Sequence, residues 1–479
     1  YKMSIRFYTR TIAFSLAVVT LFTACRKRAD VSLPDNLVVF TSAQQGIPAA
    51  ENSIIVKVQL TRPTDKDVEV RLRLTEENVG VSEYSTAPVV NVGGGADPNI
   101  MKLIIPSGNN EASFTVTKTP GVLFDGDEKL HFEINRSDAP VLIGAKKTFT
   151  LDFSEIVAPT GGFTITGGGA TYGNKVFIDL SANRQTAVNR TNWDLGFYTE
   201  AGDANFRVIL NSSVAMMAKQ INKNDLNTVT AADTTGFSAD VAYSPFAPAV
   251  TQMPYVDYPN GDLTKTAIAL IPSTAADSKV YIINRGNGVG TPAPARGWKK
   301  IRILRNASGG YTLQHADIGA TSFTSIDIPK DDAYFFKYVS FENGVLNIEP
   351  QKKKWDLAWT YFGFTTNFGG GEVPYMFQDF IIQNRNVQVA KILETSKAYN
   401  DFNEATLTDG TVALNWNTSQ TSIGSDWRRT TPSPAQTYSD RYYIIKDGDG
   451  NYYKVKFTSL ADGGQRGLPV IAFALVKKA

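Results

Sequence analysis

The chain has 479 residues, with 48 basic and 46 acidic side chains and a formal net charge of +2. This near-neutral charge argues against a protein that binds nucleic acid, for which a strong basic excess is expected. Gly, Tyr and Phe are abundant, but there are only two His and one Cys. An internal disulfide is therefore impossible, and the cores must be held together by packing alone.

The first 24 residues are predicted to be a signal peptide. Lys2, Arg6 and Arg10 form a basic segment, and residues 11–24 form an apolar run too short to span a bilayer as a helix. The run ends in L-F-T-A before Cys25, which resembles a bacterial lipoprotein signal. We therefore expect Cys25 to become the acylated N-terminus of a protein anchored to a membrane by its lipid. A plain secretory signal is the alternative.

The mature chain is expected to start with a lipidated tether over residues 25–35. Removing residues 1–24 takes away three basic side chains and changes the formal charge from +2 to −1. No later segment has the roughly 20 consecutive apolar residues that a membrane-spanning helix needs. These features predict a lipoprotein of the cell envelope.

Residues 36–157 predict an antiparallel β-sandwich. Seven short segments of alternating polar and apolar residues, separated by turn residues, cover this region. In V68-E-V-R-L-R-L the four apolar side chains share one face and the charged ones share the other. We expect this domain to act as a spacer or a docking domain.

An acidic turn in the sandwich carries its only candidate chemistry. L123-F-D-G-D-E-K-L, together with I105-P-S-G-N-N-E-A-S-F, resembles a Calx-beta-like sandwich. Asp125, Asp127 and Glu128 are weak calcium-ligand candidates, because calcium takes six to eight oxygen ligands. A solvated acidic turn is the alternative.

Residues 158–169 predict a Gly-rich linker, and an internal duplication follows it. The predicted copies cover residues 170–322 and 323–479. Matching residues keep a separation of 161 or 162 positions over more than a hundred residues: Trp193 with Trp355, Tyr281 with Tyr443, and Phe177 with Tyr338. Such a constant register predicts two tandem antiparallel β-domains, so the whole chain is expected to be all-β.

Each copy contains a W-D-L motif, formed by Trp193 and Asp194 in copy one and by Trp355 and Asp356 in copy two. In a strand, Trp and Leu point to one face and Asp points to the other. The aromatic side chain then packs in a core, while the Asp anchors a turn or pairs with a basic side chain. We interpret the motif as structural.

Copy two carries a family resemblance. F341-E-N-G, the W-D-L-A-W strand, T365-T-N-F-G-G-G and the hairpin Y442-Y-I-I-K-D-G-D-G-N-Y-Y-K-V-K-F resemble the HmuY family, and copy one resembles it more weakly. The resemblance implies an all-β, haem-binding outer-membrane lipoprotein of Gram-negative bacteria, acting in haem and iron acquisition. It also implies haem as cofactor and an outer-membrane receptor as a possible partner. Whether the protein is on the surface or the periplasmic face stays open.

The resemblance implies that haem iron is held between two axial His or Met side chains. His131 and His315 are the only histidines and lie in different domains, so a bis-His site within one copy is excluded. The haem-ligand candidates in copy one are Met216, Met217 and Met253, which lie between its W-D strand and its V-Y-I-I strand; Met376 is a weaker candidate in copy two. Core packing is the alternative role of all four methionines.

No catalytic motif stands out. The sequence has no H-E-x-x-H, G-x-S-x-G or P-loop pattern, and D447-G-D-G-N predicts a hairpin turn. We therefore expect a non-enzyme that binds haem or a related tetrapyrrole. The alternative is a structural or adhesive surface lipoprotein that binds a glycan or a protein and has lost haem binding.

Overall fold

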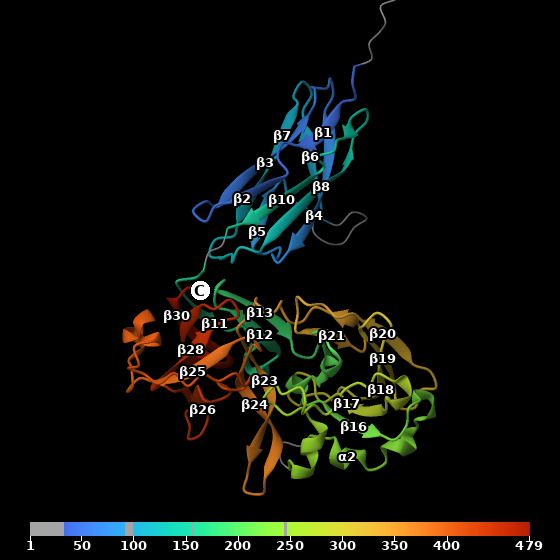
Figure 1. Cartoon of the computed structure of the whole chain (residues 1–479), viewed down its shortest axis with the longest axis vertical. Helices are drawn as coiled ribbons and strands as arrows, with labels where there is room; N and C mark the ends of the chain where they lie inside the picture. The colour runs from blue at the N-terminus through green and yellow to red at the C-terminus, as the bar shows by residue number, and fades with distance from the viewer. Residues whose placement is uncertain (1–32, 92–98, 155–156, 244–246) are drawn as a thin grey trace, which may run out of the picture. The chain divides into compact units, whose positions relative to one another are not determined.

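The computed structural model describes residues 33–91, 99–154, 157–243 and 247–479. Cys25 and the predicted signal peptide lie outside these residues. The described residues form two compact units (Figure 1): unit 1 takes those between residues 33 and 118 and residues 129–152, and unit 2 takes residues 119–128 and those between 153 and 479. Strands dominate both units, which confirms the predicted all-β class.

Unit 1 is a sandwich of two five-stranded sheets. The first sheet has the order β5-β7-β3-β1-β9, with strands β1 (Leu37–Phe40), β3 (Ser53–Leu60), β5 (Tyr84–Ala87), β7 (Glu111–Lys118) and β9 (Leu142–Ile143). The second has the order β2-β10-β8-β4-β6, with strands β2 (Gln44–Ile47), β4 (Val68–Glu77), β6 (Ile100–Ile105), β8 (Lys129–Ser137) and β10 (Thr148–Phe153).

The core of unit 1 follows from the alternation of its strands. In β4 the residues Val68, Val70, Leu72 and Leu74 are all buried, as predicted, and the residues between them are not. Aromatic rings fill the space between the sheets, with the centroid of Phe132 lying 4.7 Å from that of Phe114 on the opposite sheet. A sheet that is apolar on one face packs in this way against a second sheet.

Unit 2 contains four larger sheets and the short pair β26 (Arg428–Arg429) and β27 (Gln436–Thr437). Two sheets are built around the W-D strands. One has the order β13-β12-β23-β24, with β12 (Asn174–Asp179), β13 (Arg184–Asn189), β23 (Leu357–Asn367) and β24 (Glu372–Gln383). The other has the order β15-β14-β21-β22, with β14 (Leu195–Tyr198), β15 (Val208–Leu210), β21 (Phe336–Ser340) and β22 (Gly344–Leu346).

The two remaining sheets hold the late strands of each copy. One has the order β16-β17-β18-β19-β20, with β16 (Met217–Ile221), β17 (Val280–Asn284), β18 (Trp298–Arg305), β19 (Tyr311–Ala316) and β20 (Thr324–Ile328). The other has the order β11-β30-β29-β28-β25, with β11 (Thr160–Thr164), β25 (Gln388–Leu393), β28 (Arg441–Lys446), β29 (Tyr452–Asp462) and β30 (Gln465–Lys477).

Short helices connect the strands of unit 2. They are η1 (Gly169–Thr171), η2 (Asp203–Asn205), η3 (Ser212–Val214), η4 (Leu226–Thr228), η5 (Ala231–Thr234), α2 (Phe237–Asp240), η6 (Val250–Tyr255), η7 (Ala275–Asp277), η8 (Tyr399–Asp401) and η9 (Glu404–Leu407). Among the described residues, no helix has the length and apolar character needed to cross a membrane.

The two copies exchange their first hairpins. Strand β12 of copy one pairs with β23 of copy two, placing Ile178 opposite Leu357. Reciprocally, β21 of copy two pairs with β14 of copy one, placing Val339 opposite Leu195. Figure 1 shows β12 and β13 beside β23. The folded halves of unit 2 therefore differ from the sequence repeats.

The strands that precede the hairpins are exchanged as well. β20 pairs with β19 of copy one, and β11 pairs with β30 of copy two. The segment predicted to be a linker thus contains an edge strand. Its glycines allow the close approach, because a Cβ at Gly161 would overlap the ring of Phe473 and a Cβ at Gly162 would lie 2.6 Å from the carbonyl oxygen of Ile471.

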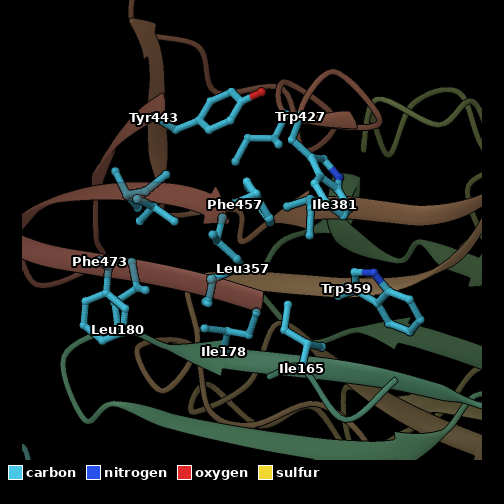
Figure 2. Close-up of a cluster of buried hydrophobic side chains, with 14 of the residues drawn as sticks. Ile165, Ile178, Leu180, Leu357, Trp359, Ile381, Trp427, Tyr443, Phe457 and Phe473 are labelled. Atoms are coloured by element: carbon cyan, nitrogen blue, oxygen red, sulfur yellow. The ribbon is translucent and has the colours of Figure 1, made fainter. Parts of the chain in front are cut away.

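The core around copy two consequently contains residues from both copies. Ile165, Ile178 and Leu180 come from the first part of unit 2, and they pack with Leu357 and Trp359. Figure 2 shows these side chains converging in one cluster. All five are at most 1 % exposed, so the exchanged segments are integral to the core.

Candidate functional site

The carboxylates of the two W-D motifs hold the exchanged hairpins. Asp194 Oδ2 accepts a hydrogen bond of 2.9 Å from the backbone N–H of Phe341, and Asp356 Oδ2 accepts one of 2.8 Å from that of Leu180. Both carboxylates are buried. The motif therefore anchors a turn of the other copy.

The two motifs differ in their charge environment. Asp194 makes a bidentate ion pair with Arg285, with distances of 2.9 and 3.0 Å. Position 447, which lies 162 residues after Arg285, is an Asp. Burial first and then the nearby Asp447 raise the pKa of Asp356 well above its ordinary value. The guanidinium of Arg285 thus compensates the negative charge of Asp194 in copy one, whereas the surroundings of Asp356 in copy two favour its protonated form.

Three of the four candidate methionines meet at one pocket between the copies. Met216 and Met217 of copy one line it together with Met376 of copy two. Ala215, with φ of 58°, turns the chain directly before Met216 and Met217. Met216 therefore lies just outside strand β16, where neighbouring side chains need not point to opposite faces as they do in a strand. All three side chains are at most 8 % exposed. Met253 lies in η6 and is not among the lining residues.

Copy two contributes the other wall through the β23–β24 hairpin, which extends from unit 2 in Figure 1. Gly363 lies opposite Met376 in this hairpin. A Cβ at Gly363 would lie 3.1 Å from the carbonyl oxygen of Ser212 and 3.4 Å from Met376 Sδ. Because Gly363 has no side chain, the Met376 thioether has room at the contact between the copies.

Aromatic side chains complete the pocket. Tyr243, Phe364 and Tyr375 line it. The backbone N–H of Met376 donates a 2.9 Å hydrogen bond to Tyr243 Oη, and burial raises the pKa of Tyr243 to about 12. The pocket is thus apolar and rich in thioethers, with a neutral phenol at its edge.

The donors of this pocket suit haem iron, but its volume does not suit the macrocycle. Thioether sulfur is an established axial haem ligand. The cavity, however, measures about 30 Å³ and the adjoining one about 90 Å³, whereas pockets for ligands of drug size hold roughly 300–1,000 Å³. Haem does not fit this conformation of the pocket.

Neither histidine lies at the methionine pocket. His315 is buried beside Phe341, with ring centroids 5.1 Å apart, and burial lowers its pKa. Its two ring nitrogens have no hydrogen-bond partner among the described residues. His131, in unit 1, contacts Glu77 and Thr150. The structure therefore offers methionine, and not histidine, as the soft ligand of this pocket.

The three calcium candidates do come together, around a lysine. Ligand oxygens of Asp125, Asp127 and Glu128 lie within 4.8 Å of one another. The ammonium of Lys354 forms ion pairs with Asp125 and Asp127. Glu128 is buried and accepts hydrogen bonds from the backbone of Asp125 and Gly126. Burial raises its pKa to about 7. A side-chain cation thus occupies the position of a metal ion.

The sequence does not indicate the contribution of the β23–β24 hairpin to the pocket. Phe364 and Tyr375 lie in long alternating strands, and this pattern is equally typical of ordinary sheet packing. Tyr243 lies in a connection without regular structure. No spacing in the sequence distinguishes these three residues, because the pocket arises only when two copies pack together.

Fold and pocket together define a duplicated all-β protein with an apolar, thioether-lined pocket between its repeats. The family model described as HmuY protein matches residues 171–312 and 333–473. The chain belongs to the HmuY family. No curated protein matches it.

Solved structures similar to this chain include two Calx domains and a bacterial protein. The apo form of the Calx CBD1 domain is 13 % identical, with 25 % of this chain and 97 % of that chain covered and a TM-score of 0.21. The Calx CBD2 domain is 12 % identical, with 25 % and 86 % covered and a TM-score of 0.19. A two-domain protein of unknown function from Bacteroides fragilis is 10 % identical, with 67 % and 88 % covered and a TM-score of 0.19. All three TM-scores lie below 0.5, so the family match carries the assignment.

Proposed function

We propose that this chain is a cell-envelope binding protein whose ligand site is the pocket between the two copies, with haem or a related tetrapyrrole as ligand. The observation that carries the proposal is the meeting of Met216, Met217 and Met376, from different copies, in one apolar pocket. Membership of the HmuY family supports it. The proposed activity is binding without turnover, for haem or iron acquisition.

Ligand entry requires the pocket to open. The wall most suited to move is the far end of the β23–β24 hairpin, because strand pairing there involves only these two strands. Near its base, β23 also pairs with β12, which holds Leu357 and Trp359 in the core. Opening of the hairpin end would separate Met376 from Met216 and Met217. A ligand that binds only the open form shifts the population toward it.

The membrane attachment is proposed on the sequence alone. Acylation of Cys25 would attach the mature protein to the outer membrane, where an outer-membrane receptor could accept its ligand. Mass spectrometry of the protein from its native membrane tests this step: a diacylglycerol-modified Cys25 is expected, and an unmodified mature N-terminus contradicts it.

Haemin titration followed by absorption tests the ligand. A saturable 1:1 change in the Soret region is expected for the unaltered chain. Met217→Leu and Met376→Leu conserve volume and remove only the sulfur, so both should alter the haem spectrum and weaken binding. Met253→Leu is the matched control and should leave the titration unchanged. Absence of any spectral change under oxidising and reducing conditions would overturn haem binding.

One observation favours an adhesive function as second candidate. Phe368 at the end of the β23–β24 hairpin is 69 % exposed, and its ring centroid lies 5.7 Å from that of Tyr375. An exposed aromatic side chain at a hairpin end is suited to contact a partner protein or a glycan. If haemin gives no signal, loss of cell-surface or glycan binding in Phe368→Ser would support this second function.

A further inference from the structure

A second cavity lies where the two W-D motifs face each other. It measures about 90 Å³ and is lined by Trp193 and Trp355. Each indole packs against the exchanged hairpin: Trp193 against Tyr338, with centroids 4.7 Å apart, and Trp355 against Phe177, with centroids 5.1 Å apart. The two copies thus contribute equivalent walls, and the cavity adjoins the methionine pocket through shared lining residues such as Gly363.

Buried donors line this cavity without partners. Lys175 is 9 % exposed and Trp193 is 3 % exposed. Among the described residues, the Lys175 ammonium has no hydrogen bond or ion pair; it lies 4.9 Å from the Phe177 ring centroid and 5.9 Å from that of Trp193. Nε1 of Trp193 and Nε of Arg385 likewise lack hydrogen-bond acceptors in this part of the chain. Buried donors left in this state are costly unless another molecule satisfies them.

An unpartnered acceptor lies in the same cavity. Glu349 is 5 % exposed. Its Oε2 accepts a 2.6 Å hydrogen bond from Tyr338 Oη, while Oε1 has no partner among the described residues. The indole of Trp355 lies near this carboxyl, but its N–H also makes no hydrogen bond. Glu349 and Lys175 both line the cavity, but they do not form an ion pair within 4.0 Å.

The other acidic side chains at this cavity are already engaged. Asp257 accepts hydrogen bonds from the backbone N–H groups of Leu210 and Ala267, at 2.6 and 3.0 Å. Asp262 accepts from Thr264 and lies 3.7 Å from Lys265 Nζ. Neither leaves a carboxylate uncompensated in the cavity. Within the described part of the chain, the groups at this cavity without a hydrogen-bond partner therefore include the donors of Lys175, Trp193 and Arg385 and the acceptor Glu349 Oε1.

We propose that this cavity is a binding site for a small organic acid that also carries a hydrogen-bond donor, such as an α-hydroxy or α-amino acid. The carboxylate of the ligand accepts hydrogen bonds from Lys175, Trp193 and Arg385, and its hydroxyl or ammonium donates to Glu349 Oε1. An apolar cavity of about 150 Å³ holds benzene, which has six non-hydrogen atoms, so this cavity of about 90 Å³ takes a ligand of no more than that size. The site uses none of the methionines, and it shares lining residues such as Gly363 with the methionine pocket.

Four probes on the unaltered full chain test the chemistry. L-lactate and L-alanine carry a carboxylate and a donor, propionate lacks the donor, and lactamide lacks the charge. In calorimetry, with the fluorescence of Trp193 and Trp355 as second readout, we expect saturable 1:1 binding of lactate or alanine. Propionate should bind several-fold more weakly, because Glu349 Oε1 then stays unpaired, and lactamide should not bind.

Variants assign the binding to this cavity. Lys175→Met keeps the apolar stem of the side chain and should weaken binding of lactate or alanine at least about tenfold, since a hydrogen bond to a charged group is lost. Lys391→Met, at a surface lysine paired with Asp426, is the matched control and should bind as the unaltered chain does. Equal binding of lactate and lactamide would overturn the proposal, as would no binding of any probe, which means that water alone fills the cavity. Should Lys175→Met fail to fold, the four-probe comparison still decides.

Discussion

Asp356 accepts a 2.8 Å hydrogen bond from the backbone N–H of Leu180, a residue 176 positions earlier in the chain. The equivalent bond in the other direction joins Asp194 to Phe341. Together these two bonds fix the ends of the exchanged hairpins, β12–β13 and β21–β22. The duplication is therefore interlocked: each copy contributes the strand and the core residues that the other one lacks.

The two motif carboxylates should respond differently to loss of charge. Asp194→Asn removes the buried carboxylate that pairs with Arg285 and Arg296, although Glu342 still pairs with Arg285. Removing one member of a buried pair costs roughly 3–5 kcal/mol. Asp356→Asn should change the free energy of unfolding by no more than about 1 kcal/mol, because burial and Asp447 already favour the neutral form. Denaturant unfolding of both variants at pH 7 measures the contrast, and equal losses would contradict it.

Asp257 should make unit 2 less stable as the pH rises from about 4 to about 7. Burial raises its pKa to about 7 in the folded protein, while hydrogen bonds from Leu210 and Ala267 oppose this rise. An unfolded Asp titrates near 3.9, so the folded state binds more protons between these values. The stabilisation is complete below about pH 4 and is lost as the pH approaches about 7.

Asp257→Asn checks this pH dependence. The variant loses one hydrogen-bond acceptor and is expected to be less stable than the unaltered chain at every pH. Between pH 4 and 7.5, however, its free energy of unfolding should fall by roughly 2–4 kcal/mol less than that of the unaltered chain. The comparison is between slopes because Glu128, whose pKa is also raised to about 7, contributes equally to both proteins. Parallel pH profiles would show that Asp257 does not titrate in this range.

The sequence reveals the duplication but not the exchange. The register between Trp193 and Trp355 predicts two similar domains, and the alternation in β4 predicts its buried face. A hairpin presents the same residues whether it packs on its own copy or on the other, so no pattern reports the exchange. The same limit applies to the site: Met253 lies at a suitable place in the sequence, yet Met376 of the other copy meets Met216 in space.

Isolated copy two, residues 323–479, should not form a stable monomer. It lacks strand β12, which pairs with β23, and strand β11, which pairs with β30. It also lacks Ile178 from the core. Size-exclusion chromatography and circular dichroism should reveal aggregation or self-association, driven by the unpaired edge of β23.

Two further experiments show whether isolated copy two is unstable because it lacks the exchanged strands or because the fragment cannot fold for another reason. Residues 157–479 contain every exchanged segment and should melt as a cooperative monomer. Mixing residues 157–322 with residues 323–479 should restore a 1:1 complex with the far-ultraviolet spectrum of the intact fragment. A monomeric, cooperatively melting copy two would contradict the hairpin exchange.

Lys354 should prevent calcium binding by the acidic turn. Its ammonium pairs with Asp125 and Asp127, the carboxylates that a calcium ion would need. Calorimetry of the unaltered chain with calcium at about 1 mM, a typical affinity range for extracellular calcium modules, should therefore give no binding heat. Lys354→Met uncovers the acidic group and should create a calcium-dependent rise in melting temperature. Lys353→Met, which removes only the surface pair with Asp449, should create none. Calcium binding by the unaltered chain would mean that the metal displaces Lys354.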